Sequence, residues 1–344
     1  MLSALDFWIY AAEAMFRAAN KQNDPTMEAA SKAQEELKRI EEQIQQLHAA
    51  AGNNQEAQKQ LMVLHERVES LKRQMSGELT AWERTELARH PNRPYPLDYI
   101  ERIFPDFSEI HGDRAFGDDA AMICGMARLR GGREVLVLGT QKGRDTKQRV
   151  YRNFGQPNPE GYRKALRAMQ FAEKWRRPII SLVDVVGAYP GLGAEERGQA
   201  EAIARATQVS LNLGVPFVAT IIGEGMSGGA LGIAVANKVL MLEHAIYAVI
   251  SPEGCASILW RSSDKAQDAA AAMRITAQDL LSLKVIDDII PEPVGGAHRA
   301  PEDAINAVGN AVAASLAEMN GMTPDQLRKQ RREKYLAMGR NLAV

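Results

Sequence analysis

The first part of the chain carries a helical pattern of apolar residues. Apolar side chains recur at spacings of three and four over residues 37–51 and again over 57–75, on either side of Gly52-Asn53-Asn54. Two such stripes pack against one another, so the pattern predicts an antiparallel helical hairpin, preceded by a short amphipathic helix over residues 1–22. Because the stripes hold no convergent polar groups, we expect the hairpin to pack on itself or on another subunit.

Beyond residue 97 the pattern changes to short apolar runs that alternate with helical stretches. Three prolines over residues 91–96 cannot continue a helix, so we predict a helical region 1–90 followed by a domain 91–344. Repeated strand–loop–helix units favour an α/β domain around a buried sheet. Strands are predicted at 120–129, 134–138, 179–183, 215–222, 238–242, 247–250 and 285–290, and helices at 82–89, 159–175, 195–213, 230–236, 251–260, 266–283, 301–319 and 324–338.

Composition narrows the function classes. A formal net charge of -1 gives no general attraction to nucleic acid or to a membrane surface. The two cysteines, Cys124 and Cys255, lie far apart without zinc-ligand spacing, so we expect no disulfide framework and no metal in this chain. The N-terminal segment has no basic region, and no apolar run is long enough to span a bilayer, so we expect a cytoplasmic protein with no membrane partner.

Residues 221–231 are the most informative stretch. Gly223, Gly225, Gly228 and Gly229 lie between an apolar, β-branched run and an Ala-rich run. Glycines let backbone amides approach a ligand closely, and free N–H groups at the start of a helix attract a negatively charged oxygen. The stretch therefore predicts an anion-binding strand–turn–helix unit.

Three templates match this stretch. Gly223-x-Gly225-x-x-Gly228, with Glu243 downstream, matches the dinucleotide fingerprint. Gly225-x-Ser227-x-Gly229 matches the nucleophile elbow of serine hydrolases, for which Asp264 or Asp287 and then His298 supply the partner order. The third template is an oxyanion hole built from the backbone amides of Gly228 and Gly229, and it alone explains why these two glycines are adjacent.

A second glycine-rich loop supports the third template. Gly187-Ala188-Tyr189-Pro190-Gly191 also runs from a strand end to a helix start, one unit earlier. Two such loops at one edge of a sheet would form a shared crevice, although Pro190-Gly191 alone is also typical of a tight turn. The basic residues Lys142, Arg144, Lys147, Arg149 and Arg152 fit either a phosphate-bearing ligand or a solvated surface.

The ordered motifs over residues 79–300 closely resemble the carboxyltransferase α-subunit family of bacterial acetyl-CoA carboxylases. The resemblance rests on Ala88-Arg89-His90-Pro91, Arg93-Pro94-Tyr95, Gln141-Lys142-Gly143-Arg144, Arg152-Asn153-Phe154-Gly155, the runs 159–166, 187–191 and 193–199, Ser227-Gly228-Gly229-Ala230, the run 250–256 and Pro291-Glu292-Pro293.

The resemblance implies a ClpP/crotonase-like superhelix of ββα units with an N-terminal helical hairpin. It implies a transferase that moves the carboxyl group of carboxybiotin to acetyl-CoA and gives malonyl-CoA for fatty acid biosynthesis. Gly228 and Gly229 would form the oxyanion hole for biotin. Substrate or cofactor contacts would come from Gly187, Ala188, Tyr189, Gly191, Gly225, Ser227, Lys142 and Arg144.

The resemblance also implies partners. These are a carboxyltransferase β subunit with a zinc ribbon, in an α2β2 heterotetramer, a biotin carboxyl carrier protein, and an ATP-dependent biotin carboxylase. The family's glycine loop usually has proline where this chain has Val186. Proline fixes φ and removes an N–H donor, so we expect a less preorganised loop here. A non-catalytic paralogue remains an alternative, alongside the serine hydrolase.

Overall fold

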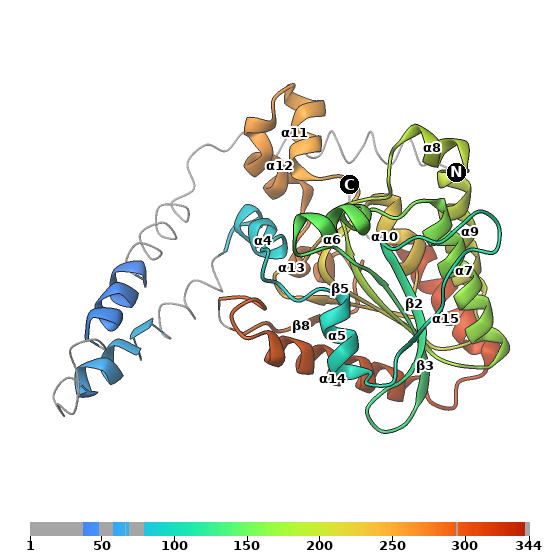
Figure 1. The fold of residues 1–344 in the computed structure, drawn as a ribbon, viewed down its shortest axis with the longest axis horizontal. Helices are drawn as coiled ribbons and strands as arrows, with labels where there is room; N and C mark the ends of the chain where they lie inside the picture. The colour runs from blue at the N-terminus through green and yellow to red at the C-terminus, as the bar shows by residue number, and fades with distance from the viewer. Residues whose placement is uncertain (1–36, 48–57, 66, 69–78, 294, 341–344) are drawn as a thin grey trace.

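The structure, a computed structural model, describes residues 37–47, 58–65, 67–68, 79–293 and 295–340. In this part of the chain, eight strands form one mixed sheet in the order β1-β2-β3-β4-β5-β6-β8, with β7 paired to β5 (Figure 1). The strands β1 to β3 pair antiparallel, and all later pairs are parallel. Their bounds are β1 Ser108–Glu109, β2 Met122–Arg128, β3 Glu134–Thr140, β4 Ile179–Val185, β5 Phe217–Met226, β6 Lys238–Leu242, β7 Ile246–Ala248 and β8 Asp288–Ile290.

Helices cover both faces of the sheet. On one face of the sheet, Gly139 of β3 lies against Pro96 of α5. The next residue, Thr140, faces the other side, and its partner in β2, Met122, lies against Gly161 of α7 on that side. The α-helices are α4 Ala81–Ala88, α5 Pro96–Ile103, α6 Thr146–Tyr151, α7 Pro159–Lys174, α8 Leu192–Glu196, α9 Gln199–Asn212, α10 Ser227–Ala234, α11 Pro252–Trp260, α12 Ala266–Met273, α13 Ala277–Ser282, α14 Pro301–Glu318 and α15 Pro324–Ala337.

The central strands are apolar along their whole length because both faces are covered. Every residue of β4 and of β5 is buried. A strand buried on both sides loses the alternation of a half-exposed strand and reads as a continuous apolar run. The α/β class and the strands expected from such runs are therefore confirmed.

Three local predictions are wrong. The helix expected over 195–213 is two helices, because Gly198 adopts a left-handed φ of 81° between α8 and α9. The helix expected over 266–283 is also two, because Arg274 ends α12 in the left-handed region. The glycine turn expected after residue 222 is absent: β5 continues through Gly223 and Gly225 to Met226 and passes directly into α10.

The N-terminal stripes are described only in part. Helical residues 37–47, 58–65 and 67–68 bring Ile40 together with Val68, and Leu37, Ile44 and Leu64 pack around them. The expected helix over 1–22 lies outside the described residues. The division of the chain at residue 90 stays a prediction. Over the described ranges, no helix combines the length and the apolarity needed to cross a bilayer.

Candidate functional site

The candidate site lies where three parallel strands end. The strands β3, β4 and β5 are neighbours and run in the same direction, so their carboxyl ends share one edge of the sheet. The chain then continues into α6, α8 and α10, which lie at this edge in the upper part of Figure 1. Loops at the carboxyl ends of parallel strands form the common ligand site of α/β proteins.

The start of α10 touches the other glycine-rich segment, the loop Gly187–Gly191, at Gly229. An ideal Cβ on Gly229 would lie 2.7 Å from the amide nitrogen of Ala188 and 2.8 Å from the carbonyl carbon of Gly187. No side chain fits there, so the start of α10 packs directly on the backbone of the earlier loop. At Gly187, where φ is 140°, an added Cβ would meet nothing within 4 Å. The start of α10 and the second loop are therefore in contact at Gly229, and the surface beside Gly187 is open, whereas the shared crevice stays a prediction.

The first turn of α10 offers N–H groups to a ligand. Met226, the residue before the helix, makes no side-chain capping bond. The first N–H groups of a helix have no intrahelical acceptor, and the helix dipole adds positive potential at this end. The buried Tyr162 hydroxyl donates a hydrogen bond of 3.2 Å to the carbonyl oxygen of Gly229, which fixes the orientation of the turn. This turn is suited to an anionic oxygen.

The second loop is held from behind by the segment that precedes α7. The amide of Tyr189 donates to the carbonyl oxygen of Pro157 at 3.0 Å. The side-chain nitrogen of Gln199 donates to the carbonyl oxygens of both residues, each at 2.9 Å. The ring of Tyr189 lies over Gly191, where a Cβ would collide with it. Predicted residues Ala188, Tyr189 and Gly191 therefore form one braced loop.

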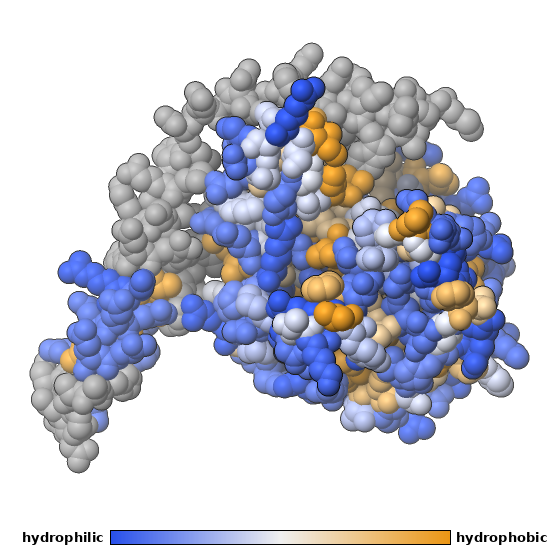
Figure 2. Space-filling view, turned by 45° about the horizontal axis from the view of Figure 1, so that its top comes forward, coloured by the Kyte–Doolittle hydropathy of each residue, from blue (hydrophilic) through white to orange (hydrophobic). Residues whose placement is uncertain are grey.

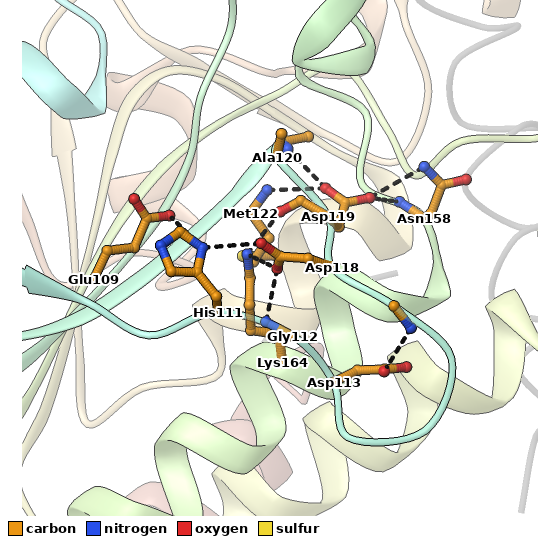
Figure 3. Close-up of polar contacts among 12 residues, drawn as sticks. Glu109, His111, Gly112, Asp113, Asp118, Asp119, Ala120, Met122, Asn158 and Lys164 are labelled. Atoms are coloured by element: carbon orange, nitrogen blue, oxygen red, sulfur yellow. Dashed lines mark hydrogen bonds and ion pairs between the residues drawn. The ribbon is translucent and has the colours of Figure 1, made fainter.

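Asp119 anchors this brace (Figure 3). One carboxylate oxygen accepts the backbone amide of Asn158 at 2.7 Å and its side-chain nitrogen at 3.1 Å. The other oxygen accepts the amides of Ala121 and Met122 at 2.7 and 3.1 Å. Lys164, fully buried, donates to the carbonyl oxygen of Asp119 at 2.7 Å. Because every oxygen and the ammonium group are used within the protein, this cluster is a support and not a ligand site.

Lys142 lies at the carboxyl ends of β4 and β5 and is ion-paired. Its ammonium group is 2.8 Å from a carboxylate oxygen of Asp184 and 2.9 Å from one of Glu224. Burial alone would lower the pKa of Lys142, but the two carboxylates outweigh burial and hold that pKa above its ordinary value. The lysine is therefore a permanent cation, and its role as a ligand contact stays a prediction.

The other predicted basic residues are distributed around α6. Arg144 pairs with Asp98 and stacks over the ring of Tyr95, 4.6 Å from its centroid. Arg149 donates to the carbonyl oxygen of Gly143 at 3.2 Å, and Arg152 donates to that of Ala120 at 2.6 Å. These contacts order the segment after β3, and a phosphate-binding role for Arg144 stays a prediction.

Two of the three sequence templates do not fit this geometry. Gly223 and Gly225 are strand residues, and a Cβ on Gly225 would lie 2.9 Å from the ring of Tyr247, so they do not form a phosphate-binding turn. Ser227 is exposed with a φ of 57°, a feature shared with a nucleophile elbow. Among the described residues, however, no histidine or carboxylate forms a hydrogen bond with its hydroxyl group, as the hydrolase template requires.

Sequence reasoning missed the acids that hold Lys142. Asp184 and Glu224 are buried, with side chains 2% and 5% exposed. Both lie at the ends of apolar runs that the sequence predicts as buried strands, and a buried charge requires a partner. Their position at the ends of buried strands therefore predicts that each acid needs a cation as its partner. Lys142, in the loop after the preceding strand, is a cation that could have been assigned this role. Within the described residues, no group of three metal-ligating side chains is present.

Comparison with known proteins identifies relatives along nearly the whole chain. Residues 30–339 match the family model described as acetyl co-enzyme A carboxylase carboxyltransferase-like. The chain is 57% identical over 277 residues to the acetyl-coenzyme A carboxylase carboxyl transferase subunit alpha of Sphingopyxis alaskensis, covering 80% of this chain and 88% of that protein. It is 52% identical over 304 residues to the protein of the same name from Rhodopseudomonas palustris, covering 88% and 95%.

A solved structure shares the fold. Transcarboxylase 12S, in a structure with methylmalonyl-coenzyme A and methylmalonic acid bound, aligns with a TM-score of 0.55 and 20% identity. The alignment covers 67% of this chain and 42% of that chain. At this identity the likeness establishes the fold alone, and it agrees with the crotonase-like fold expected from the sequence.

Proposed function

The chain belongs to the acetyl-CoA carboxylase carboxyltransferase family, and on that premise we propose that it is the α subunit that receives biotin during carboxyl transfer to acetyl-CoA. The observation that carries the proposal is the contact of Gly229 with the backbone of Gly187 and Ala188. It supports a crevice in which backbone amides, and not side chains, face the ligand.

The residues present fit the ureido oxygen of biotin. Carboxybiotin, when delivered by its carrier protein, supplies the carboxyl group. The amides of Gly228 and Gly229 would hold the ureido oxygen of biotin and would stabilise negative charge on it. One such preorganised donor typically lowers the activation free energy of the reaction by roughly 3–4 kcal/mol. The surface beside Gly187 is open, so the planar ring of biotin would lie there, next to Ala188, Tyr189 and Gly191.

The charged residues beneath the crevice are supports in this proposal. Lys142, Asp184 and Glu224 are paired with one another, which leaves none of them as a general base. Proton transfer from acetyl-CoA therefore falls to groups outside this network, including groups of the ligand and of a partner subunit. This supports a chain that works as one part of a shared active site.

An exposed apolar rim supports a partner subunit at this edge. Large apolar residues in α6, α8, α10 and α11 and in the turn that follows α6 are exposed: Val150 63%, Phe154 55%, Leu192 72%, Leu231 44% and Ile258 72%. Figure 2, which turns the top of Figure 1 forward, shows orange residues among blue ones on this face. Extended apolar surface next to a functional crevice is typical of a protein interface.

We assign this rim to the carboxyltransferase β subunit. The zinc ribbon, the α2β2 assembly, the biotin carboxyl carrier protein, the biotin carboxylase and a cytoplasmic location belong to the same proposal. The GxSxG hydrolase and the non-catalytic paralogue are the alternatives to it.

Co-expression with a β subunit tests the function. The purified complex should form malonyl-CoA from acetyl-CoA and carboxybiotin, and should carboxylate free biotin from malonyl-CoA in the reverse direction. The isolated chain should do neither. A complex that forms but transfers no carboxyl group in either direction, with an active complex from a relative as the control, would support the non-catalytic paralogue instead.

A further inference from the structure

A largely buried lysine joins the carboxyl ends of two neighbouring strands at the candidate site. Lys142 follows β3, and its ammonium group contacts Asp184 at the end of β4 and Glu224 near the end of β5. Only 14% of the lysine side chain is exposed. Gly155 confines its stem, because a Cβ there would lie 2.6 Å from Cγ of Lys142. The ammonium group therefore has one position, between the two carboxylates.

The pairing of β4 with β5 shifts its register at this point. Val183 pairs with Ile221, but Val185 pairs with Gly225, so β5 uses four residues where β4 uses two. Such a bulge bends a strand and re-aims the residues beyond it, and bulges are frequent beside active sites. Here the residues beyond the bulge are Ser227, Gly228 and Gly229, at the start of α10.

Asp184 fills and holds the bulge. Its carboxylate accepts the amide N–H of Glu224 at 2.9 Å. A Cβ on Gly223 would lie 2.5 Å from the same carboxylate oxygen, so only glycine leaves room for it. Asp184 also lies three residues before Gly187 in the other loop. One carboxylate thus connects the direction of β5 with the position of the second loop, and Lys142 holds that carboxylate.

A second cation extends the network. Arg89 is 2.7 Å from the other oxygen of Glu224 and 2.5 Å from Glu253, in the first turn of α11. Burial alone would raise the pKa of Glu224, but Lys142 and then Arg89 outweigh burial and hold it below its ordinary value. Both carboxylate oxygens of Glu224 are therefore fixed, one by each cation.

We propose that Lys142 is a positioning residue for the carboxyl-transfer site: by holding Asp184 and Glu224 together it sets the bulge that aims the Gly228 and Gly229 amides at the crevice beside Gly187. The inference rests on the proposed function, and it assigns Lys142 a role other than contact with a phosphate of the substrate. The two roles differ in their kinetic effects, because a ligand contact affects KM, whereas misplaced oxyanion donors affect kcat.

Lys142→Met, in the full chain with its β subunit, tests the proposal. A misplacement of about 1 Å can cost 100-fold in rate, so we expect kcat to fall by about 30-fold or more, with KM for acetyl-CoA within about threefold. Hydrogen exchange of peptides covering 184–193 and 221–232 should accelerate. Lys142→Met leaves the buried carboxylate of Asp184 without its cation. In the double variant Lys142→Met/Asp184→Asn, which removes that carboxylate, Tm should recover while kcat stays low.

Arg331→Met is the matched control. Arg331 is a fully buried cation, and it donates to the carbonyl oxygens of Ser210 and Leu213 at 2.8 and 2.7 Å, before β5 begins and so at the opposite edge of the sheet. We expect it to lower Tm while kcat stays within about twofold, and exchange at the two loop peptides should not change.

Two results would overturn the inference. One is a raised KM with unchanged kcat in Lys142→Met, as expected for a phosphate contact. The other is exchange in the loop peptides that matches the parent protein. Because exchange is measured without substrate, it tests the positioning role even if the parent complex transfers no carboxyl group, a result that would count against the proposed function alone.

Discussion

Gly229 lies so close to Gly187 that a Cβ at position 229 would come within 2.8 Å of the Gly187 carbonyl carbon. Carbon atoms that are not bonded to one another do not approach so closely, so any side chain at position 229 forces the start of α10 and the second loop apart. Gly228, the neighbouring residue, differs: a Cβ there would lie 3.5 Å from Cγ2 of Ile203, an ordinary contact. The chain therefore offers two adjacent glycines with opposite tolerance to the same substitution.

Gly229→Ala should lower carboxyl transfer by about 100-fold, because it displaces the turn that carries the oxyanion donors. The methyl group overpacks the contact between Gly229 and the backbone of Gly187 and Ala188, which should cost about 1–3 kcal/mol of stability without unfolding the protein. Steady-state carboxylation of biotin from malonyl-CoA and thermal denaturation measure the two effects.

Gly228→Ala is the control for this substitution. It adds the same methyl group in available space and keeps the backbone amide, so its loss of rate and of Tm should both be smaller. Equal losses of rate in the two variants would show that contact between the loops is not what sets the activity.

Ser227→Ala separates carboxyl transfer from serine hydrolysis. The hydroxyl of Ser227 is exposed, and its removal leaves the backbone amides of the turn in place. Alanine has a similar cost to serine at the φ of 57°, so folding should be preserved. We expect carboxyl transfer within about threefold of the parent, whereas loss of a nucleophilic serine typically costs more than about 1000-fold. A loss of that size would restore the hydrolase interpretation.

Most of the sheet could be predicted from the sequence because its strands are buried on both faces. Continuous apolar runs mark β4 and β5 without any knowledge of their neighbours. The end of β5 could not be predicted, because the run Gly223-Glu224-Gly225 is a poor strand by propensity. It is held in the sheet by tertiary contacts with Asp184 and Lys142, which lie 40 and 82 residues away from Glu224.

The backbone donors of the candidate site could be predicted from the sequence, but the side chains that hold those donors in place could not. Adjacent glycines at a strand–helix junction signal backbone donors directly, which is why the sequence proposes Gly228 and Gly229 as the donors. The supports depend on pairing between distant segments, which no local pattern encodes. Tyr162, for example, reaches Gly229 from α7 across 67 residues of chain. Such contacts become visible only once the sheet is assembled.

Val186→Pro should make the second loop more rigid. Val186 follows the last residue of β4 and its side chain is 39% exposed, so a proline ring has access to solvent there. Proline at a compatible position stabilises by about 0.4–1 kcal/mol, chiefly by restricting the unfolded chain. We expect a higher Tm, slower hydrogen exchange over 187–191 and a modest rise in kcat. Val186→Ala, which lacks the ring, serves as control; no gain over it would contradict the preorganisation argument.

A histidine pair formed by His90 and His298 makes stability depend on pH. The two rings stack with centroids 3.7 Å apart, and Nδ1 of His298 is buried without a hydrogen-bond partner among the described residues. Burial, followed by His90, Arg299 and Arg93, lowers the pKa of His298 to about 4, and Glu292 acts weakly in the opposite direction. The folded protein therefore keeps this ring neutral.

His298→Gln should reduce the loss of stability in acid. An unfolded histidine binds its proton near its ordinary pKa of about 6.5, whereas folded His298 binds one only near pH 4. Between these values the unfolded chain holds more protons, so the contribution of His298 to stability is complete above about pH 6.5 and is lost as the pH falls toward 4. Thermal denaturation from pH 7.5 to 4.5 should show a smaller fall in Tm for His298→Gln than for the parent. The control is His111→Gln, which removes a histidine whose side chain is 63% exposed. An equal fall in Tm for the parent and for His298→Gln would contradict the assignment.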